Sequence, residues 1–249
     1  MCLITFVPAG VLPDLTALVM GAVVNPHGHG WAVLTDTAVV TGHGMHPEQV
    51  IAEFADTRDK YPDGPAVFHS RWATRGIIGP GNCHPFPLGR DRRTWLVHNG
   101  TLPKRVHPGP YDPRSDTRIA AQEYLPRQPF GSVDTRRGFR GLESWLGTGK
   151  LVLLSIDPAY SHRSYVFNEH LGVWDAGIWY SNTGYRAHTL TPGHCRSCRS
   201  GQRVPGSRYC TRCGWCFVCF ARFPDCGCHH LPAPRASGTP PEDRPLTRH

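Results

Sequence analysis

The sequence predicts an α+β domain over residues 2–190, followed by a small cysteine-rich module. Short β-branched and aromatic runs bounded by Gly and Pro alternate with helical patterns, so strands and helices are mixed along one stretch. Eight of the ten cysteines lie between positions 195 and 228, where aliphatic residues become scarce. A chain of 249 residues is long enough for one full-sized domain and a small appended module.

The individual elements follow from the period of their apolar residues. Strands are expected at residues 2–7, 25–34 (after a Gly-rich turn), 65–72, 94–100, 150–156, 164–169 and 177–182. Helices are expected near 11–20, at 46–60, at 115–125 behind a Ser/Asp cap, and near 142–146. Mixed strands and helices packed in layers indicate an α+β or sandwich-like α/β domain.

The cysteine-rich module, residues 192–230, is expected to bind zinc. Its cysteines form four close pairs, and two CxxC knuckles complete a tetrahedral Zn²⁺ site. The predicted ligands are Cys195, Cys198, Cys210, Cys213, Cys216, Cys219, Cys226 and Cys228. About two structural zinc ions are expected, because thiolate-only sites leave no open coordination position. Interleaved pairing remains open, as does a ligand role for His229 or His230, and a redox CxxC is less favoured.

Composition bears on the C-terminal stretch, on localisation and on possible partners. The Pro-rich stretch 231–249 is predicted to be disordered, because it holds too little apolar surface to bury. No apolar run is long enough to span a bilayer, and the first residues lack the pattern of a signal peptide, so a soluble cytoplasmic protein is expected. Residues 189–249 carry nine Arg against three acids. Zinc-bound thiolates would offset most of this charge, so nucleic acid is a weakly supported partner.

Cys2 is a candidate nucleophile because of its position. Removal of Met1 gives it a free α-amine with a pKa of about 7.7–8.0, which can accept the thiol proton at physiological pH. Such a residue carries its own base and needs no separate histidine. Taken alone, a cysteine at this position is more often an ordinary strand residue.

Further motifs stand in the order found in one enzyme family. They are Met-Cys at the start, NPHGHGW, FHSRWATRG, NCHPF, VHNG, SDT before a helix, and WYSN in a late strand. With them the chain resembles the class II glutamine amidotransferase domain, an N-terminal-nucleophile (Ntn) hydrolase. The resemblance covers about residues 2–188 and is to the stand-alone type, since nothing like a synthase domain follows. It implies a four-layer α/β/β/α sandwich and hydrolysis of the glutamine side-chain amide.

The resemblance also implies residue roles. Cys2 would form a γ-glutamyl thioester, and the Asn99 side chain and Gly100 N–H would stabilise the oxyanion. The substrate carboxylate would meet Arg71, with Thr74 beside it, and the substrate ammonium would meet Asp116. Donors of this kind contribute about 2.7–4 kcal/mol each to transition-state stabilisation, and an arginine fork suits a carboxylate. The structural alternatives are a surface ion pair for Arg71 and a helix cap for Asp116.

Other positions bear on the substrate or on the fold. Arg75 and Arg118 add positive charge where many relatives differ, which favours a substrate larger or more anionic than glutamine. Phe86 stands where some synthase-linked relatives have a second histidine. Three histidines and one cysteine near the motifs are expected to be structural: His69, His84, His98 and Cys83.

The sequence therefore indicates three candidate functions. The first is a glutamine amide hydrolase that passes ammonia to water or to a separately encoded synthase docked on the zinc module. The second is a γ-glutamyl amidohydrolase that trims a small-molecule conjugate. The third is an inactive amidotransferase-like platform whose zinc module binds protein or nucleic acid. The retained catalytic set argues against the third.

Overall fold

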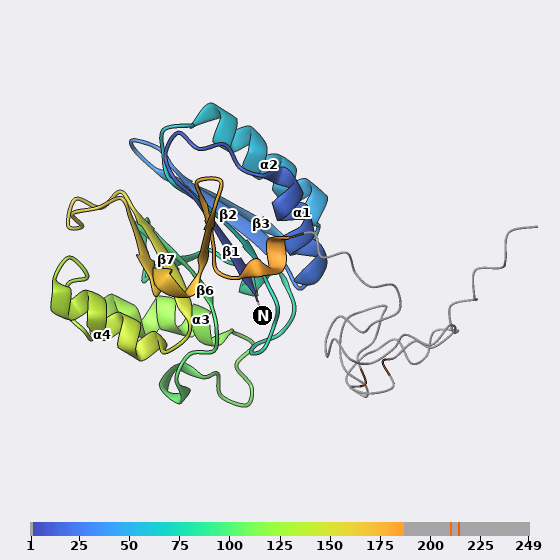
Figure 1. The fold of residues 1–249 in the computed structure, drawn as a ribbon. Coiled ribbons are helices and arrows are strands. Elements are labelled where there is room, and N and C mark those ends of the chain that lie inside the picture. Colours follow the sequence, from blue (N-terminus) through green and yellow to red (C-terminus); the bar gives the residue numbers. More distant parts are fainter. Residues whose placement is uncertain (1, 187–209, 211–213, 215–249) are drawn as a thin grey trace, which may run out of the picture. The chain divides into compact units, whose positions relative to one another are not determined.

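The computed structural model describes residues 2–186, 210 and 214. The chain divides into two compact units, Met1–Ala187 and His188–His249. The first unit contains two antiparallel sheets with helices beside them (Figure 1). The predicted mixture of helices and strands is confirmed in this unit. The predicted tail 231–249 lies outside the described residues, as does module 192–230 apart from positions 210 and 214.

The larger sheet has six strands in the order β3-β2-β4-β1-β10-β9, and every neighbouring pair is antiparallel. Its strands are β1 Leu3–Val7, β2 His29–Leu34, β3 Val39–Gly44, β4 Ala66–Ser70, β9 Val173–Asp175 and β10 Ile178–Tyr180. Strand β1 is therefore an inner strand, although it begins at the third residue of the chain. The register pairs Leu3 with Ser70, so Cys2 lies beside the residues that follow β4.

The smaller sheet has four antiparallel strands in the order β5-β6-β7-β8. Its strands are β5 Phe86–Leu88, β6 Asp91–Asn99, β7 Lys150–Ser155 and β8 Ser164–Phe167. Asn99 is the last residue of the inner strand β6 and pairs with Lys150. The predicted strand at 94–100 therefore begins three residues earlier and ends one residue earlier than its motif.

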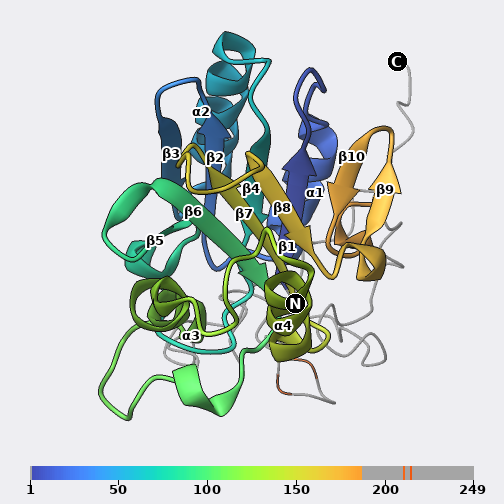
Figure 2. The same ribbon diagram turned by 90° about the vertical axis from the view of Figure 1, so that its left-hand side faces the viewer.

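The α-helices are α1 Leu15–Val24, α2 Pro47–Lys60, α3 Asp116–Ile119 and α4 Arg136–Leu146. The predicted helix at 115–125 is α only in its first turn and continues as a π-helical turn over Ala120–Tyr124. Ser115 caps α3 by accepting a hydrogen bond from Arg118 N. Figure 2 shows α1 and α2 beside the larger sheet and α3 and α4 beside the smaller one.

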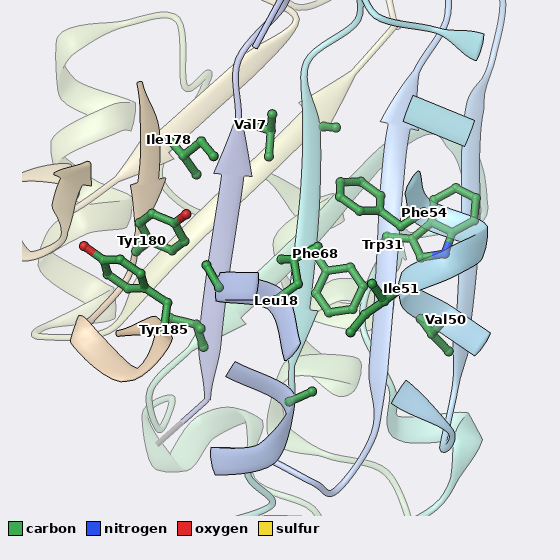
Figure 3. Close-up of a cluster of buried hydrophobic side chains, with 14 of the residues drawn as sticks. Val7, Leu18, Trp31, Val50, Ile51, Phe54, Phe68, Ile178, Tyr180 and Tyr185 are labelled. Carbon is green, nitrogen blue, oxygen red and sulfur yellow. The ribbon is translucent and has the colours of Figure 1, made fainter. Parts of the chain in front are cut away.

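Three buried cores hold these layers together. The first lies between α1, α2 and the larger sheet, and includes Leu18, Phe54 and Phe68 (Figure 3). The second lies between the smaller sheet and the segments α3 to α4. The third joins the facing sides of the two sheets, where Trp179 of β10 is fully buried.

Side-chain alternation along β1 explains how one strand serves two cores. Leu3 and Val7 point to the helical side, whereas Ile4 and Phe6 point toward the other sheet. Successive side chains of a strand face opposite sides, so a run that is apolar throughout is buried on both. This packing is compatible with the layered sandwich that the sequence predicts.

Three strands were not predicted, and each lies at the edge of its sheet. Strand β3 (VVTGHG) contains two glycines, and β9 has only three residues. Strand β5 contains Pro87, which cannot donate to a ladder and is therefore found at edges. Each of these strands pairs with an inner neighbour, and glycine, proline or short length weakens the strand signal of its own sequence.

Candidate active site

Cys2 lies at the entry to β1 with its thiol against the main chain of Trp72. Trp72 N–H donates to Cys2 Sγ at 3.2 Å, and Sγ lies 3.4 Å from the Trp72 carbonyl oxygen. The antiparallel register of β1 and β4 imposes this contact, because it places Cys2 beside Arg71 and Trp72. The motif that begins the chain and the HSRWAT motif are thus adjacent in space.

The environment of the thiol favours its protonated form. Burial raises the pKa of Cys2, and Asp116 adds to the rise. The Trp72 hydrogen bond and the charge of Arg71 act in the opposite direction without cancelling the effect of burial. A nucleophilic role for this thiol therefore requires a base that removes its proton, and a free α-amine on the same residue could do so.

Arg71 is buried and is held by main-chain carbonyls. Its guanidinium donates to Ile77 O at 3.0 Å and to Arg75 O at 2.8 Å. Only 2% of the residue is exposed, and it forms no ion pair with the described residues. The alternative of a surface ion pair is therefore wrong. Further guanidinium N–H groups remain to bind an anion.

Asp116 stands at the start of α3 but is not its cap, because Ser115 fills that role. Its Oδ2 accepts from Leu102 N at 3.0 Å, and its Oδ1 accepts from Thr117 N at 2.8 Å. The residue is 4% exposed. Asp116 thus fixes the loop that follows Gly100 and places negative charge near Cys2.

Asn99 and Gly100 end β6 on the smaller sheet. Asn99 Nδ2 donates to Ser181 Oγ at 2.8 Å, while the buried Oδ1 has no hydrogen-bond partner among the described residues. Gly100 has φ 151°, and a Cβ there would lie 2.9 Å from Gly149 Cα and 3.1 Å from His98 Nε2. Glycine is therefore required at position 100 by both backbone conformation and space.

A cavity of about 20 Å³ joins most of these groups. The described residues that line it are Cys2, Arg71, Trp72, Thr74, Arg75, His84, His98, Gly100, Ser115, Asp116 and Thr117. Five of the six predicted site residues are among them, and Asn99 is the exception. The volume suits about one water molecule. Wider hollows of about 510 and 520 Å³ beside α4 contain none of the predicted residues.

Two buried histidines, His84 and His98, line this cavity, and His69 packs against His84. The rings of His69 and His84 lie 3.9 Å apart, and His69 Nε2 is 3.1 Å from His98 O. His98 Nδ1 is 3.0 Å from Thr117 Oγ1. Burial lowers the pKa of His69 to about 3 and that of His98 to about 4, so both are neutral at pH 7. Cys83 is likewise buried, with a thiol pKa raised by burial.

Two residues beside the cavity had no predicted role. Ser181 Oγ accepts from Ile4 N at 2.9 Å, and Asn182 Nδ2 donates to Cys2 O at 2.7 Å. Both belong to the WYSN motif, so the sequence marked the segment without indicating the function of its polar side chains. The signal for that function is a pair of hydrogen-bonding residues directly after a buried strand.

The predicted zinc ligands lie outside the described residues, apart from Cys210, which is buried. The seven others are Cys195, Cys198, Cys213, Cys216, Cys219, Cys226 and Cys228. Within the part of the chain that the structure describes, no group of three or more His, Cys, Asp or Glu is arranged to hold a metal. The zinc sites remain a prediction.

Comparison with known proteins gives a distant structural likeness. No family model and no curated protein matches the sequence. The glutamine phosphoribosylpyrophosphate (PRPP) amidotransferase from B. subtilis, complexed with ADP and GMP, matches with 14% identity and a TM-score of 0.43. The match covers 72% of this chain and 41% of that protein. Similarity at this level carries no functional argument, so the function is argued from this chain's own residues.

The length and hydrophobicity of the described helices bear on whether any of them could span a membrane. None of them is both long enough and apolar enough to cross a membrane.

Proposed function

We propose that this chain hydrolyses the side-chain amide of glutamine or of a γ-glutamyl compound, with Cys2 as the nucleophile. The observation that carries the proposal is the lining of the small cavity. Cys2, Arg71, Gly100 and Asp116 come from four separate segments of the chain and border one space. A thiol, a guanidinium, a main-chain donor and a carboxylate are the groups that amide hydrolysis of an amino acid requires.

The first chemical step uses the two ends of Cys2. After Met1 is removed, the neutral α-amine accepts the thiol proton, and Sγ attacks the amide carbonyl carbon. The carbonyl electrons move to oxygen, where Gly100 N–H and the Asn99 amide donate hydrogen bonds. Collapse of this intermediate breaks the C–N bond, and the leaving nitrogen takes the proton and departs as ammonia. A γ-glutamyl thioester remains on Cys2.

The second step restores the enzyme. A water molecule gives a proton to the α-amine and adds to the thioester carbonyl, and the C–S bond then breaks. Glutamate leaves, and the proton returns to Sγ. The overall reaction converts glutamine and water into glutamate and ammonia, and a separately encoded synthase is one candidate to receive that ammonia.

Two buried charges recognise the amino-acid end of the substrate in this proposal. Arg71 binds the α-carboxylate and Asp116 binds the α-ammonium, while Thr74 stands exposed at the carboxylate end of the cavity. Low exposure of both charges strengthens their interaction with a ligand relative to that in water. The three packed cores support assignment to the Ntn-type α/β/β/α sandwich.

Ammonia release from glutamine, measured with protein of verified N-terminus, tests the proposal. Cys2→Ala should abolish release while the fold is retained, and protein that keeps Met1 should be nearly inactive. Cys83→Ala is the matched control, because Cys83 is another free thiol whose pKa is raised by burial but it does not line the cavity. Full turnover by Cys2→Ala or by protein retaining Met1 would refute the mechanism. Absence of release from every γ-glutamyl amide would leave the inactive platform as the remaining alternative.

A γ-glutamyl conjugate with an extra anionic group is the second candidate substrate. Arg75 lines the cavity, is exposed, and its guanidinium makes no hydrogen bond or ion pair with the described residues. An unpaired guanidinium at the mouth suits a carboxylate or phosphate. Comparison of kcat/KM for glutamine and for an anionic γ-glutamyl amide tests this choice. Arg75→Ala should reduce the preference for the anionic substrate and leave glutamine turnover intact.

A further inference from the structure

We propose that Ser181 and Asn182 are positioning residues that hold the nucleophile and the oxyanion donor in register across the two sheets. This inference rests on the proposed function for Cys2 and Asn99. The pair follows β10 directly, and Ser181 is fully buried. The Ser181 side chain contacts Asn99 of the smaller sheet, and the Asn182 side chain donates a hydrogen bond to Cys2, which carries the thiol.

Ser181 connects β1 to the end of β6. Its main-chain N–H donates to Ile4 O at 2.9 Å, and its Oγ accepts from Ile4 N at 2.9 Å. The same Oγ lies 2.8 Å from Asn99 Nδ2. This contact is the one hydrogen bond that the Asn99 side chain makes with the described residues. The orientation of the predicted oxyanion donor therefore depends on Ser181.

The donors and acceptors around Asn99 determine which way its side-chain amide is oriented. Ser181 Oγ already accepts from Ile4 N, and its hydroxyl proton needs an acceptor. Asn99 Oδ1 is buried without a partner among the described residues. Oxygen and nitrogen of an amide are interchangeable in shape, so a half-turn lets Oδ1 accept the Ser181 proton. Both hydrogens on Asn99 Nδ2 are then left to bind an oxyanion.

Asn182 restrains the nucleophile itself. Its Nδ2 donates to Cys2 O at 2.7 Å, and its Oδ1 accepts from Gly184 N at 2.9 Å. The bond from Gly184 identifies the oxygen end, so the nitrogen end faces Cys2. The peptide group of Cys2 is thus tied to the same short segment that orients Asn99.

The hydrogen bonds of Ser181 to Asn99 and of Asn182 to Cys2 matter because the reacting groups belong to different sheets. Cys2 enters the larger sheet, whereas Asn99 ends a strand of the smaller one. A shift of about 1 Å between reacting groups can cost about 10²-fold in rate. Consecutive residues that bind both groups limit such a shift more directly than the apolar core between the sheets does.

A double-mutant cycle tests the role of Ser181. Ser181→Ala should lower kcat about 10–100-fold with little change in KM, since a misplaced oxyanion donor acts mainly in the transition state. In an Asn99→Ala background the same change should have no further effect. Ser155→Ala is the matched control, because Ser155 is also buried and bonds Thr94 on the smaller sheet at 2.7 Å. Equal kcat losses in both serine variants, or full additivity with Asn99→Ala, would overturn the inference.

Asn182 should show a different phenotype. Asn182→Ala should change the rate at which iodoacetamide alkylates Cys2, followed by mass spectrometry of the Cys2 peptide. Ser181→Ala should leave that rate unchanged, because alkylation forms no oxyanion. An Asn182→Ala protein with unaltered alkylation would refute the proposed hold on the nucleophile.

A crystal structure of Ser181→Ala decides the inference without any turnover. Asn99 should leave the side-chain rotamer that it has in the unaltered protein, and an unchanged rotamer would overturn its dependence on Ser181. Failure of the unaltered protein to release ammonia would refute the proposed function. The Asn99 rotamer and the Cys2 alkylation rates would still decide whether these residues position the two groups.

Discussion

The two sheets contribute different parts of the candidate site, and the groups that they supply are paired to different degrees. On the larger sheet, Cys2 Sγ and the Arg71 guanidinium each have main-chain partners. On the smaller sheet, Asn99 Oδ1 is buried without a partner among the described residues. Arg71 is a fixed charge that can bind a carboxylate in the ground state, whereas the N–H groups of the Asn99 amide, once its Oδ1 accepts from Ser181, can donate to an oxyanion that develops only in the transition state. Substitutions on the two sheets should therefore change different kinetic constants.

The largest effect expected among these substitutions is on the smaller sheet. Asn99→Ala should lower kcat for glutamine by about 10²–10³-fold with little change in KM, because its amide acts on the developing oxyanion. Steady-state ammonia release measures both constants. A variant that instead raised KM at unchanged kcat would place Asn99 in substrate binding and remove the contrast between the sheets.

Substitutions on the larger sheet should mainly change the KM for glutamine. Arg71→Lys keeps the charge but loses the planar fork, and the KM for glutamine should rise about 10-fold with a smaller change in kcat. Arg58→Lys is the matched control, since Arg58 is also buried and donates to four main-chain carbonyls. Arg58 lies away from the cavity, so its variant should lower stability and leave KM unaltered. Equal KM changes in both variants would indicate that Arg71 is purely structural.

Acid should weaken the fold through the histidines at the strand ends. Burial lowers the pKa of His29 and His98 to about 4 and that of His69 to about 3, against an ordinary value of 6.5. The unfolded chain therefore binds more protons than the folded one between about pH 4 and 6.5, and stability falls as pH falls through that range. Each histidine contributes a slope of up to about 1.4 kcal/mol per pH unit.

Urea midpoints measured from pH 8 to pH 5 test this expectation. The midpoint should stay level near pH 8 and then fall below about pH 6.5. His29→Gln should reduce the slope, whereas replacement of the exposed His46 by Gln should not. A midpoint independent of pH would show that the buried histidines gain protons in the folded protein.

The smallest effect on amide chemistry should come from metal removal. Purified protein should contain about two zinc ions by elemental analysis, and chelation should leave ammonia release unchanged, because thiolate-only sites cannot activate water. A chain ending at residue 190 should also retain activity. Disulfides in place of metal would refute the zinc prediction, and loss of hydrolysis in a folded truncated protein would place part of the site beyond residue 190.

The sequence by itself determined the inner strands and most of the chemistry. Runs such as those of β1, β4 and β7 are mostly apolar and are buried on both faces, which leaves little choice of structure. The motifs around Cys2, Arg71 and Asp116 likewise indicated residues that the fold brings to one cavity. Each of these signals is contained within a few consecutive residues.

Only the tertiary structure decided the edge strands and the contacts between the sheets. Strands β3, β5 and β9 are fixed by pairing with the inner neighbours β2, β6 and β10, and this pairing is a contact between strands that the edge sequences do not encode by themselves. The bond between Asn99 and Ser181 joins residues 82 positions apart, and no local pattern encodes it. Backbone propensity and apolar period act over short stretches, whereas pairing of buried polar groups depends on which segments the packed cores bring together.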